Sequence, residues 1–455
     1  MKIVLMGCNH AGTWAAKTLL RKKKPEDEVL IFDRNDNISF LGCGIALWVS
    51  GLVENPKTLF YSSLEELEKM GAKVFMRHEI SAINAAQKVV EVTNLKTGEK
   101  FSQPYDKLII GSGSWPVQPP WPGIDLEGVL VSKLYQHAQS IIAKVEDPNV
   151  RSVAVIGAGY IGVELAEAFD KHGKKVYLIE MQDAIAPHNF DREISAKLVQ
   201  GVEQNTSINL RLGEKVTRFI GDEQGHIRAV ETDQDTYQVD MAIVSVGFRA
   251  RIEPARGQIE TDPQRGIIVN EYFQTSNPDI YAIGDCVAQK YNPDACFKPV
   301  MLATNAVRSG IVAAINVMEP GKLAFSGVQG TNAIHVFGWT LASTGLTELQ
   351  SQEVGCSHRN VGSIFVEDYD KPVFMPQRHK VFFKVVFDRD TREIIGAQIA
   401  SQADHASVMY MLSLAIEKKV KIDELGLIDT YFLPHLNQPV NFITRASLQY
   451  LNVVD

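Results

Sequence analysis

The sequence predicts an α/β protein with two Rossmann-like dinucleotide-binding domains and a C-terminal α+β domain. Three observations lead to this prediction. A unit of strand, glycine turn, helix, strand and terminal carboxylate occurs twice, at residues 2–33 and 152–180. The 455 residues suffice for two to four domains with sizeable cores. After residue 322 the chain alternates apolar segments such as Lys380–Phe387 with a helical pattern at Ser407–Lys418, without a further nucleotide unit.

The composition is that of an ordinary globular protein. The chain carries 46 Lys and Arg residues against 54 Asp and Glu residues, a net charge of −8, and 45% of its residues are hydrophobic. This balance excludes a disordered chain, and the acidic charge argues against nucleic acid or an anionic membrane as the main partner. No stretch approaches the ~18 uninterrupted apolar residues of a membrane helix. We expect a cytoplasmic protein that binds neither nucleic acid nor membranes.

The cysteines are odd in number and form no close pair. The five are Cys8, Cys43, Cys286, Cys296 and Cys356. A disulfide scaffold would need more cysteines in a shorter chain, and a zinc site would need a cluster of Cys or His. We therefore expect free thiols in a reducing compartment and no metal site.

The first nucleotide unit occupies residues 2–33. Its expected parts are a strand at Lys2–Met6, a turn at Gly7–Gly12, a helix from Thr13 to about Lys23, a strand at Glu28–Phe32, and the carboxylate of Asp33. A glycine turn lets backbone approach a pyrophosphate, the helix N-terminus favours its negative charge, and the carboxylate binds a ribose. The candidate binding residues of this unit are Gly7, Asn9, His10, Ala11, Gly12 and Asp33. Asn9 stands where the pattern usually has its middle glycine.

The second unit follows the glycine pattern without departure. Its expected parts are a strand at Ser152–Ile156, a turn at Gly157–Gly162, a helix from Val163 to about His172, a strand at Lys175–Ile179, and Glu180. A carboxylate at this position favours the free ribose hydroxyl of NADH over the phosphate of NADPH, and no arginine directly follows it. The candidate NADH-binding residues are Gly157, Gly159, Tyr160, Ile161, Gly162, Glu180, and Gly247 at the end of a buried strand.

Two further strands complete a recognisable set. Asp106–Ile110 leads into the small-residue loop Gly111–Ser114, and Thr275–Ile283 ends in Gly284-Asp285. Together with the two units, these segments resemble the FAD- and NAD(P)H-dependent pyridine nucleotide–disulfide oxidoreductases over the whole chain. The resemblance implies that FAD is the first nucleotide and NADH the second. It also implies FAD contacts from Cys43, Ser112, Gly113, Asp285, Ala303 and Thr304, the last two at a helix start after Lys298-Pro299.

Cys43 narrows the resemblance. Disulfide reductases of this family carry two cysteines about five residues apart, whereas Asn37–Ile45 contains one, flanked by Gly42 and Gly44. A single cysteine with a histidine in the first glycine turn resembles the NADH oxidase and NADH peroxidase branch. Cys43 and His10 are therefore the implied catalytic residues. A lone thiolate can accept an oxygen atom from peroxide and become a sulfenic acid, and we expect a helix N-terminus and His10 to lower its pKa.

The resemblance favours an FAD-dependent NADH oxidase that reduces O2 to water. NADH peroxidase, which consumes H2O2, is the nearest alternative, and a coenzyme A-disulfide reductase is the third. A non-catalytic flavoprotein that senses NADH is a further alternative, although sensing needs neither Cys43 nor His10. Tyr160 resembles the family tyrosine that covers the flavin until nicotinamide displaces it.

The order of segments predicts the domain organisation. Residues 1–118 and 248–322 form a discontinuous FAD domain, 119–247 the NADH domain, and 323–455 the domain that the resemblance identifies with dimerisation. The return segment departs from the family pattern, because Arg249-Ala250-Arg251 stands where many relatives have Arg-Pro-Asn. A homodimer is implied, with C-terminal residues near the partner's flavin. His435 either belongs to that site or is an ordinary surface or core histidine.

Overall fold

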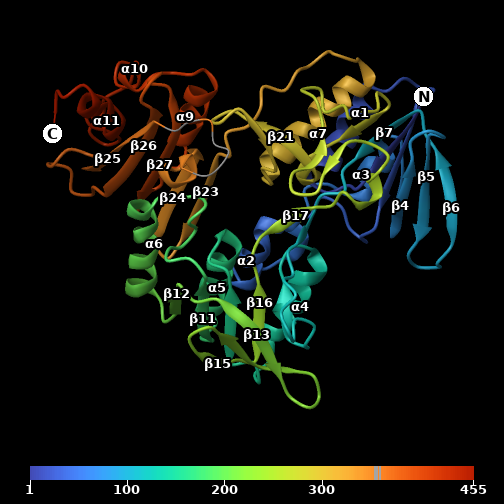
Figure 1. Ribbon diagram of the computed structural model, residues 1–455, viewed down its shortest axis with the longest axis horizontal. Coiled ribbons are helices and arrows are strands. Elements are labelled where there is room, and N and C mark those ends of the chain that lie inside the picture. Colours follow the sequence, from blue (N-terminus) through green and yellow to red (C-terminus); the bar gives the residue numbers. More distant parts are fainter. Residues whose placement is uncertain (353–356, 358–359, 455) are drawn as a thin grey trace.

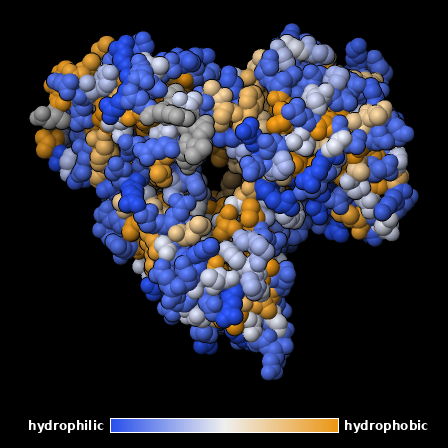
Figure 2. Space-filling view, in the orientation of Figure 1, coloured by the Kyte–Doolittle hydropathy of each residue, from blue (hydrophilic) through white to orange (hydrophobic). Residues whose placement is uncertain are grey.

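The computed structural model describes residues 1–352, 357 and 360–454, and Cys356 lies outside this part. Three lobes are visible in Figure 1: the first nucleotide unit with residues near 300, the second unit below it, and the C-terminal region at the other side. The lobes surround a hollow in the space-filling view, where polar and apolar residues are interspersed over the surface (Figure 2). No helix in the described ranges is long and apolar enough to cross a membrane.

The first lobe is built on a parallel sheet with the strand order β20-β7-β1-β2-β3. These strands are β1 (Lys2–Met6), β2 (Glu28–Asp33), β3 (Ala72–Met76), β7 (Lys107–Ile110) and β20 (Ile280–Ala282). Helices α1 (His10–Lys22) and α7 (Ala303–Met318) pack together beside it. Helix α1 starts three residues before the predicted Thr13, because the turn continues directly into helical conformation after Asn9. His10 is therefore in the first helical turn.

Smaller elements surround this sheet. They are the antiparallel sheet β4 (His78–Asn84), β5 (Val89–Asn94) and β6 (Lys100–Pro104); the sheet β18 (Thr261–Asp262), β19 (Gly266–Ile268), β21 (Val287–Tyr291) and β22 (Cys296–Lys298); and helices α2 (Ile45–Val49) and α3 (Leu64–Lys69). The short helix α2 packs against the second lobe, because Phe40, Ile45 and Leu59 share a hydrophobic cluster with Phe169 of that lobe. The segment that carries Cys43 thus bridges the two nucleotide units.

The second lobe repeats the parallel architecture with the order β12-β11-β10-β16-β9. Its elements are β9 (Val129–Val131), α4 (Tyr135–Glu146), β10 (Ser152–Ile156), α5 (Tyr160–Lys171), β11 (Lys175–Glu180), α6 (Arg192–Asn205), β12 (Asn209–Leu212), β13 (Val216–Gly221), β14 (Ile227–Thr232), β15 (Thr236–Gln238) and β16 (Met241–Val244). The chain enters and leaves this lobe side by side, because β8 (Ser114–Pro116) pairs antiparallel with β17 (Phe248–Ala250).

The C-terminal lobe contains a five-stranded antiparallel sheet with the order β23-β24-β27-β26-β25. Its elements are β23 (Asn332–Val336), β24 (Trp339–Gly345), α8 (Glu348–Ser351), β25 (Val361–Tyr369), β26 (Lys380–Asp388), β27 (Ile394–Ser401), α9 (Val408–Glu417), α10 (Ile422–Leu425) and α11 (Phe442–Tyr450). The strand predicted at Lys380–Phe387 and the helix predicted at Ser407–Lys418 correspond to β26 and α9 to within one residue at each end.

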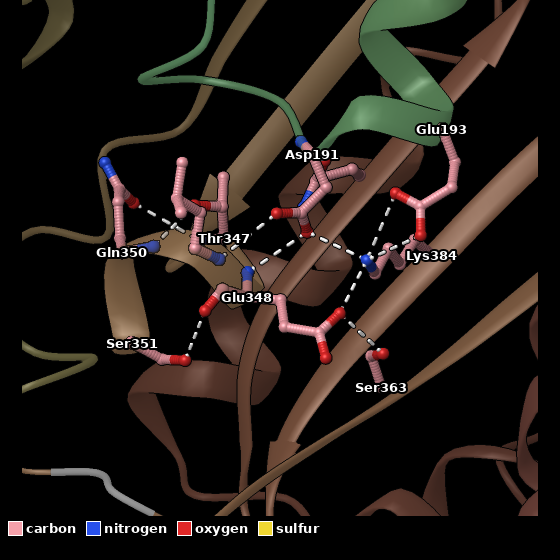
Figure 3. A network of polar contacts seen from close by, with 10 residues as sticks. Asp191, Glu193, Thr347, Glu348, Gln350, Ser351, Ser363 and Lys384 are labelled. Atoms are coloured by element: carbon pink, nitrogen blue, oxygen red, sulfur yellow. Dashed lines mark hydrogen bonds and ion pairs between the residues drawn. The ribbon is translucent and has the colours of Figure 1, made fainter. Parts of the chain in front are cut away.

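A buried ionic network joins the second lobe to the C-terminal lobe (Figure 3). The Lys384 side chain is 2% exposed, and its ammonium group lies 3.2 Å from Asp191, 3.2 Å from Glu193 and 2.8 Å from Glu348. Asp191 also accepts hydrogen bonds from the backbone of Glu348 and Leu349 at the start of α8. Buried charges are tolerated only when they are paired in this way, so the network fixes α6 against β26.

Candidate functional site

A first cleft lies at the carboxyl ends of β1, β2, β7 and β20, where parallel α/β sheets bind ligands. It is open to solvent and has an empty volume of about 880 Å³. Nine of the predicted FAD-binding residues line it: Gly7, Asn9, His10, Ala11, Gly12, Asp33, Ser112, Gly113 and Asp285. The structure therefore brings together residues from four separate segments of the sequence.

Glycine is required at two positions of the Gly7–Gly12 turn, because neighbouring backbone atoms lie too close for a side chain. Gly7 has φ +86°, and a Cβ atom there would lie 2.3 Å from the carbonyl oxygen of Gly111. A Cβ atom on Gly12 would lie 2.0 Å from the carbonyl oxygen of Gly7. The helix N-terminus is thereby held tightly against the strands, with its amides facing the cleft.

Asp33 closes the turn from the end of β2. Its carboxylate accepts hydrogen bonds from the backbone N–H of Cys8 at 2.7 Å and of Asn35 at 2.7 Å. Burial raises the pKa of Asp33, and these two hydrogen bonds oppose the rise. The carboxyl group is thus fixed at the place where a ribose would meet it.

Asp285 shares the cleft with a lysine that the sequence analysis did not identify. Ser114 donates a hydrogen bond to the Asp285 carboxylate at 2.7 Å, and the Lys133 ammonium lies 2.7 Å from the Ser114 hydroxyl oxygen and 3.5 Å from Asp285. Lys133 follows β9 of the second lobe and reaches into the cleft of the first. The one feature of the sequence that could have identified Lys133 is its position just after the carboxyl end of a parallel strand, where such sheets bind ligands.

Arg251 is a second residue that the sequence analysis left unassigned. It belongs to the return segment that departs from the family pattern, and its guanidinium is paired with Glu79 of β4 at 2.5 Å. Arg34 lies near the same carboxylate and over the Trp115 ring, 5.1 Å from the ring centroid. All four residues line the first cleft. The departure from the pattern thus supplies a cation to the cleft wall.

His10 faces Tyr61 across the edge of the cleft. Its Nδ1 atom lies 3.3 Å from the Tyr61 hydroxyl, and the two rings are parallel to within 4° at 5.8 Å. Burial lowers the pKa of the imidazole, against the opposing effect of Asp285. His10 is therefore neutral at pH 7 and is suited to accept or pass on a proton.

Cys43 lies at the rim of the first cleft and does not line it. It belongs to the single turn Gly42–Gly44 that precedes α2, and its thiol is free and exposed. A Cβ atom on Gly42 would lie 3.2 Å from the carbonyl oxygen of Lys133, a residue of the cleft wall. No hydrogen bond joins Cys43 to His10 within the ranges that the structure describes.

The expectation of a lowered thiol pKa is corrected by the structure. Although the residue as a whole is exposed, the atoms packed around its thiol desolvate it and raise the pKa of Cys43, and the carboxyl group of Glu164 acts in the same direction. Helix α2 has only five residues, and His10 is neutral, so neither supplies the expected positive charge. Burial together with Glu167 raises the pKa of Glu164 itself to about 7, so this carboxyl is partly protonated near neutral pH.

A second cleft, with about 1610 Å³ of empty space, lies at the carboxyl ends of β10, β11 and β16. The predicted residues Gly157, Gly159, Tyr160, Ile161, Glu180 and Gly247 line it. Glu180 repeats the pattern of the first unit, since its carboxylate accepts the N–H of Ala158 at 2.8 Å and of Gln182 at 2.9 Å. Gly162 does not line the cleft, but a Cβ atom there would lie 1.9 Å from the Gly157 carbonyl oxygen.

Three of the remaining predicted residues lie apart from the clefts. Ala303 and Thr304 form the first turn of α7 but do not line the first cleft, whereas Ala306 does. His435 lies in the exposed segment between α10 and α11. Their predicted contacts stay predictions.

The residues present fit two dinucleotides. Each cleft combines a helix N-terminus without a side-chain cap, a glycine turn and a carboxylate fixed by two backbone amides. Free amides suit a pyrophosphate, and the carboxylate suits a ribose. No group of three His, Cys, Asp or Glu side chains that could hold a metal ion occurs among the described residues.

Comparison with known proteins agrees with this arrangement. Residues 1–310 match the pyridine nucleotide-disulphide oxidoreductase family, and residues 331–439 match the dimerisation domain of that family. An NADH oxidase of Enterococcus faecalis is 43% identical over 452 residues, which cover 99% of this chain and 100% of that protein. An NADH oxidase of Mycoplasma pneumoniae is 41% identical over 472 residues, covering 99% and 98%.

A solved structure has the same fold over its whole length. The water-forming NADH oxidase of Lactobacillus brevis bound to NADH is 38% identical, with a TM-score of 0.94 over 100% of this chain and 99% of that one. The family matches over residues 1–310 and 331–439, the sequence identity and the fold therefore agree. The chain therefore belongs to the pyridine nucleotide-disulphide oxidoreductase family.

Proposed function

We propose that this protein is an FAD-dependent NADH oxidase that reduces O2 to water through a single redox-active cysteine. The observation that carries the proposal is Cys43 at the rim of the first cleft, between two dinucleotide units, because among the described cysteines it is the exposed free thiol. The relatives from E. faecalis and M. pneumoniae are named NADH oxidases, and the L. brevis neighbour is described as water-forming.

The first cleft would hold FAD. The amides of the Gly7–Gly12 turn would bind its pyrophosphate and Asp33 a ribose, while Asp285 and Lys133 would lie beside the central part of the molecule. When bound, FAD accepts a hydride from NADH and passes electrons on to oxygen. The predicted contacts of Ala303 and Thr304 with FAD belong to this proposal.

The second cleft would bind NADH at the Gly157–Gly162 turn. Glu180 would accept hydrogen bonds from the adenosine ribose, and its negative charge would repel the 2′-phosphate of NADPH. Lys215 also lines this cleft, but it lies beyond the carboxylate in the sequence and does not form an ion pair with it within the described residues. The chain is therefore expected to prefer NADH.

Cys43 would complete the reduction of oxygen to water. Its thiolate attacks one oxygen of peroxide, the O–O bond breaks, and the products are Cys43 sulfenic acid and hydroxide. A second NADH supplies the two electrons that return the sulfenic acid to the thiol with release of water. His10, neutral and fixed by Tyr61, would take the thiol proton and supply protons to the departing oxygen.

We also propose the domain limits and the assembly. Residues 1–118 and 248–322 would bind FAD, 119–247 NADH, and 323–455 a second copy of the chain in a cytoplasmic homodimer. The limits near residues 118 and 248 are supported by the pairing of β8 with β17, where the chain passes between the two nucleotide units. Exposed apolar side chains on the C-terminal lobe support the third: Tyr410, Leu414, Leu427, Tyr431, Phe432, Leu433 and Leu436.

An oxygen electrode tests the proposed activity. The oxidase is expected to consume about two NADH per O2 without releasing peroxide, because four electrons convert O2 to water. The Cys43→Ser variant is expected to consume about one NADH per O2 and to accumulate H2O2, because it lacks the thiol that reduces peroxide. NADH loss that requires added H2O2 and no O2 would instead identify a peroxidase.

A further inference from the structure

The side chain of Tyr160 is tied to the C-terminal lobe. Tyr160 is the first residue of α5, directly after the glycine turn of the second cleft, and its ring lines that cleft. Its hydroxyl donates a hydrogen bond to the Oδ1 atom of Asn332, the first residue of β23. The ring also stacks on the buried Phe190, with the centroids 6.0 Å apart.

Asn332 is itself held in one orientation. Its Nδ2 group donates to the carbonyl oxygen of Gly330 at 2.6 Å, and its Oδ1 atom accepts a second hydrogen bond from Ser343 at 3.2 Å. Asn332 and Ser343 are directly opposite each other on β23 and β24. An amide fixed at both ends is a rigid acceptor, so the Tyr160 hydroxyl has a preformed partner.

Tyr160 lies on the helix that packs against the Cys43 segment. Tyr160 and Glu164 are four residues apart on α5 and therefore share a face of the helix. Helix α5 packs against α2, and α2 directly follows the turn that carries Cys43. A nucleotide in the second cleft meets Tyr160, which lines this cleft directly after the glycine turn.

We infer that Asn332 is a positioning residue that latches Tyr160 over the inner end of the second cleft and so lowers the affinity for NAD(H). The inference rests on the proposed function, in which nicotinamide has to reach the first cleft. Opening the latch breaks the hydrogen bond from Tyr160 to Asn332. Through Asn332, the C-terminal lobe thereby controls the affinity of the second cleft for NAD(H).

The affinity of the oxidised, FAD-containing enzyme for NAD⁺, measured by calorimetry, tests the latch. Asn332→Ala and Tyr160→Phe are each expected to lower the Kd about three- to tenfold, the range for one hydrogen bond between neutral groups. The double variant should bind no tighter than either single variant, because all three lack the same bond. Asn332→Asp keeps the acceptor oxygen and should bind NAD⁺ no tighter than the parent.

Glu167→Ala is the matched control for loosening of the same interface. Glu167 accepts a hydrogen bond from the backbone of Phe337 at 2.7 Å, so it also ties α5 to the C-terminal lobe, at the turn that follows β23, but does not line either cleft. Its NAD⁺ affinity should equal that of the parent. An unchanged or raised Kd in Asn332→Ala and Tyr160→Phe, or an equal fall in Glu167→Ala, would overturn the latch. A parent flavin that NADH does not reduce would instead overturn the proposed function.

Discussion

The two nucleotide units share a plan and differ in the size and the charged lining of their clefts. In both, a carboxylate at the end of the second strand accepts two backbone amides, through Asp33 in one unit and Glu180 in the other. Around the first, Lys133 and Arg251 reach in from distant segments and the cleft has about 880 Å³. The second has about 1610 Å³, and Met181, next to its carboxylate, is 66% exposed.

This difference separates a resident cofactor from a nucleotide that exchanges. A cleft closed by charged side chains from several segments releases its ligand only when those segments move apart. A larger cleft with fewer charged side chains on its wall suits binding and release during each turnover. The shared strand-turn-helix scaffold thus supports both uses, and the surrounding side chains decide between them.

The first-position glycines should separate the two units most strongly. Gly7 and Gly157 have φ values of +86° and +97°, and Cβ atoms there would lie 2.3 and 2.6 Å from carbonyl oxygens. Gly7→Ala is expected to abolish FAD retention, measured as flavin absorbance of the purified protein. Gly157→Ala should remain yellow but lose reduction by NADH. Loss of flavin from both variants would contradict the division of roles.

The attachment of the second unit to the C-terminal lobe should contribute strongly to stability. Lys384→Met leaves Asp191, which is 6% exposed, and two further carboxylates without their cation. Breaking a buried ion pair in this way is expected to lower the free energy of unfolding by about 3–5 kcal/mol in urea titrations. Lys171→Met, which removes a surface pair between two turns of one helix in which the lysine is 56% exposed, should cost at most about 0.5 kcal/mol. Equal losses of unfolding free energy in the two variants would show that the buried network stabilises the protein no more than the surface pair does.

Removing each ribose carboxylate should affect only one nucleotide. Glu180→Ala is expected to weaken NADH binding about ten- to a hundredfold, the value of hydrogen bonds to a charged group, and to narrow the preference over NADPH. Asp33→Ala should weaken FAD retention and leave the affinity for NADH per bound flavin unchanged. Nucleotide titrations of both variants check this, and a loss of NADH affinity in Asp33→Ala would show that the clefts are not independent.

The smallest expected effect concerns the pH dependence of Cys43. Burial and Glu164 raise the pKa of this thiol, so its thiolate forms only as the pH rises through that raised value. Alkylation of the flavin-free protein by iodoacetamide should therefore accelerate toward alkaline pH. Glu164→Gln removes one carboxyl group and should move the midpoint of the curve of alkylation rate against pH to lower pH. A midpoint that stays in place would exclude Glu164 as a determinant of thiol reactivity.

The sequence predicted the repeated units because each depends on local chemistry: a glycine turn, an amphipathic helix and a carboxylate within about thirty residues. Lys133, Arg251, Tyr61 and Asn332 were not found, because their roles depend on contacts between segments far apart in the chain. The predicted low pKa of Cys43 was wrong for the same reason. The prediction of a lowered pKa considered only a neighbouring helix and a histidine. Desolvation of the thiol and the distant Glu164 instead raise the pKa of Cys43.

An anaerobic NADH titration of peroxide-treated enzyme tests most directly that Cys43 is a redox centre coupled to the first cleft. The account predicts about two NADH per FAD for the parent, one for the flavin and one for the Cys43 sulfenic acid, and about one for Cys43→Ser. Equal consumption of about one NADH per FAD by both proteins would contradict it, because Cys43 would then accept no electrons.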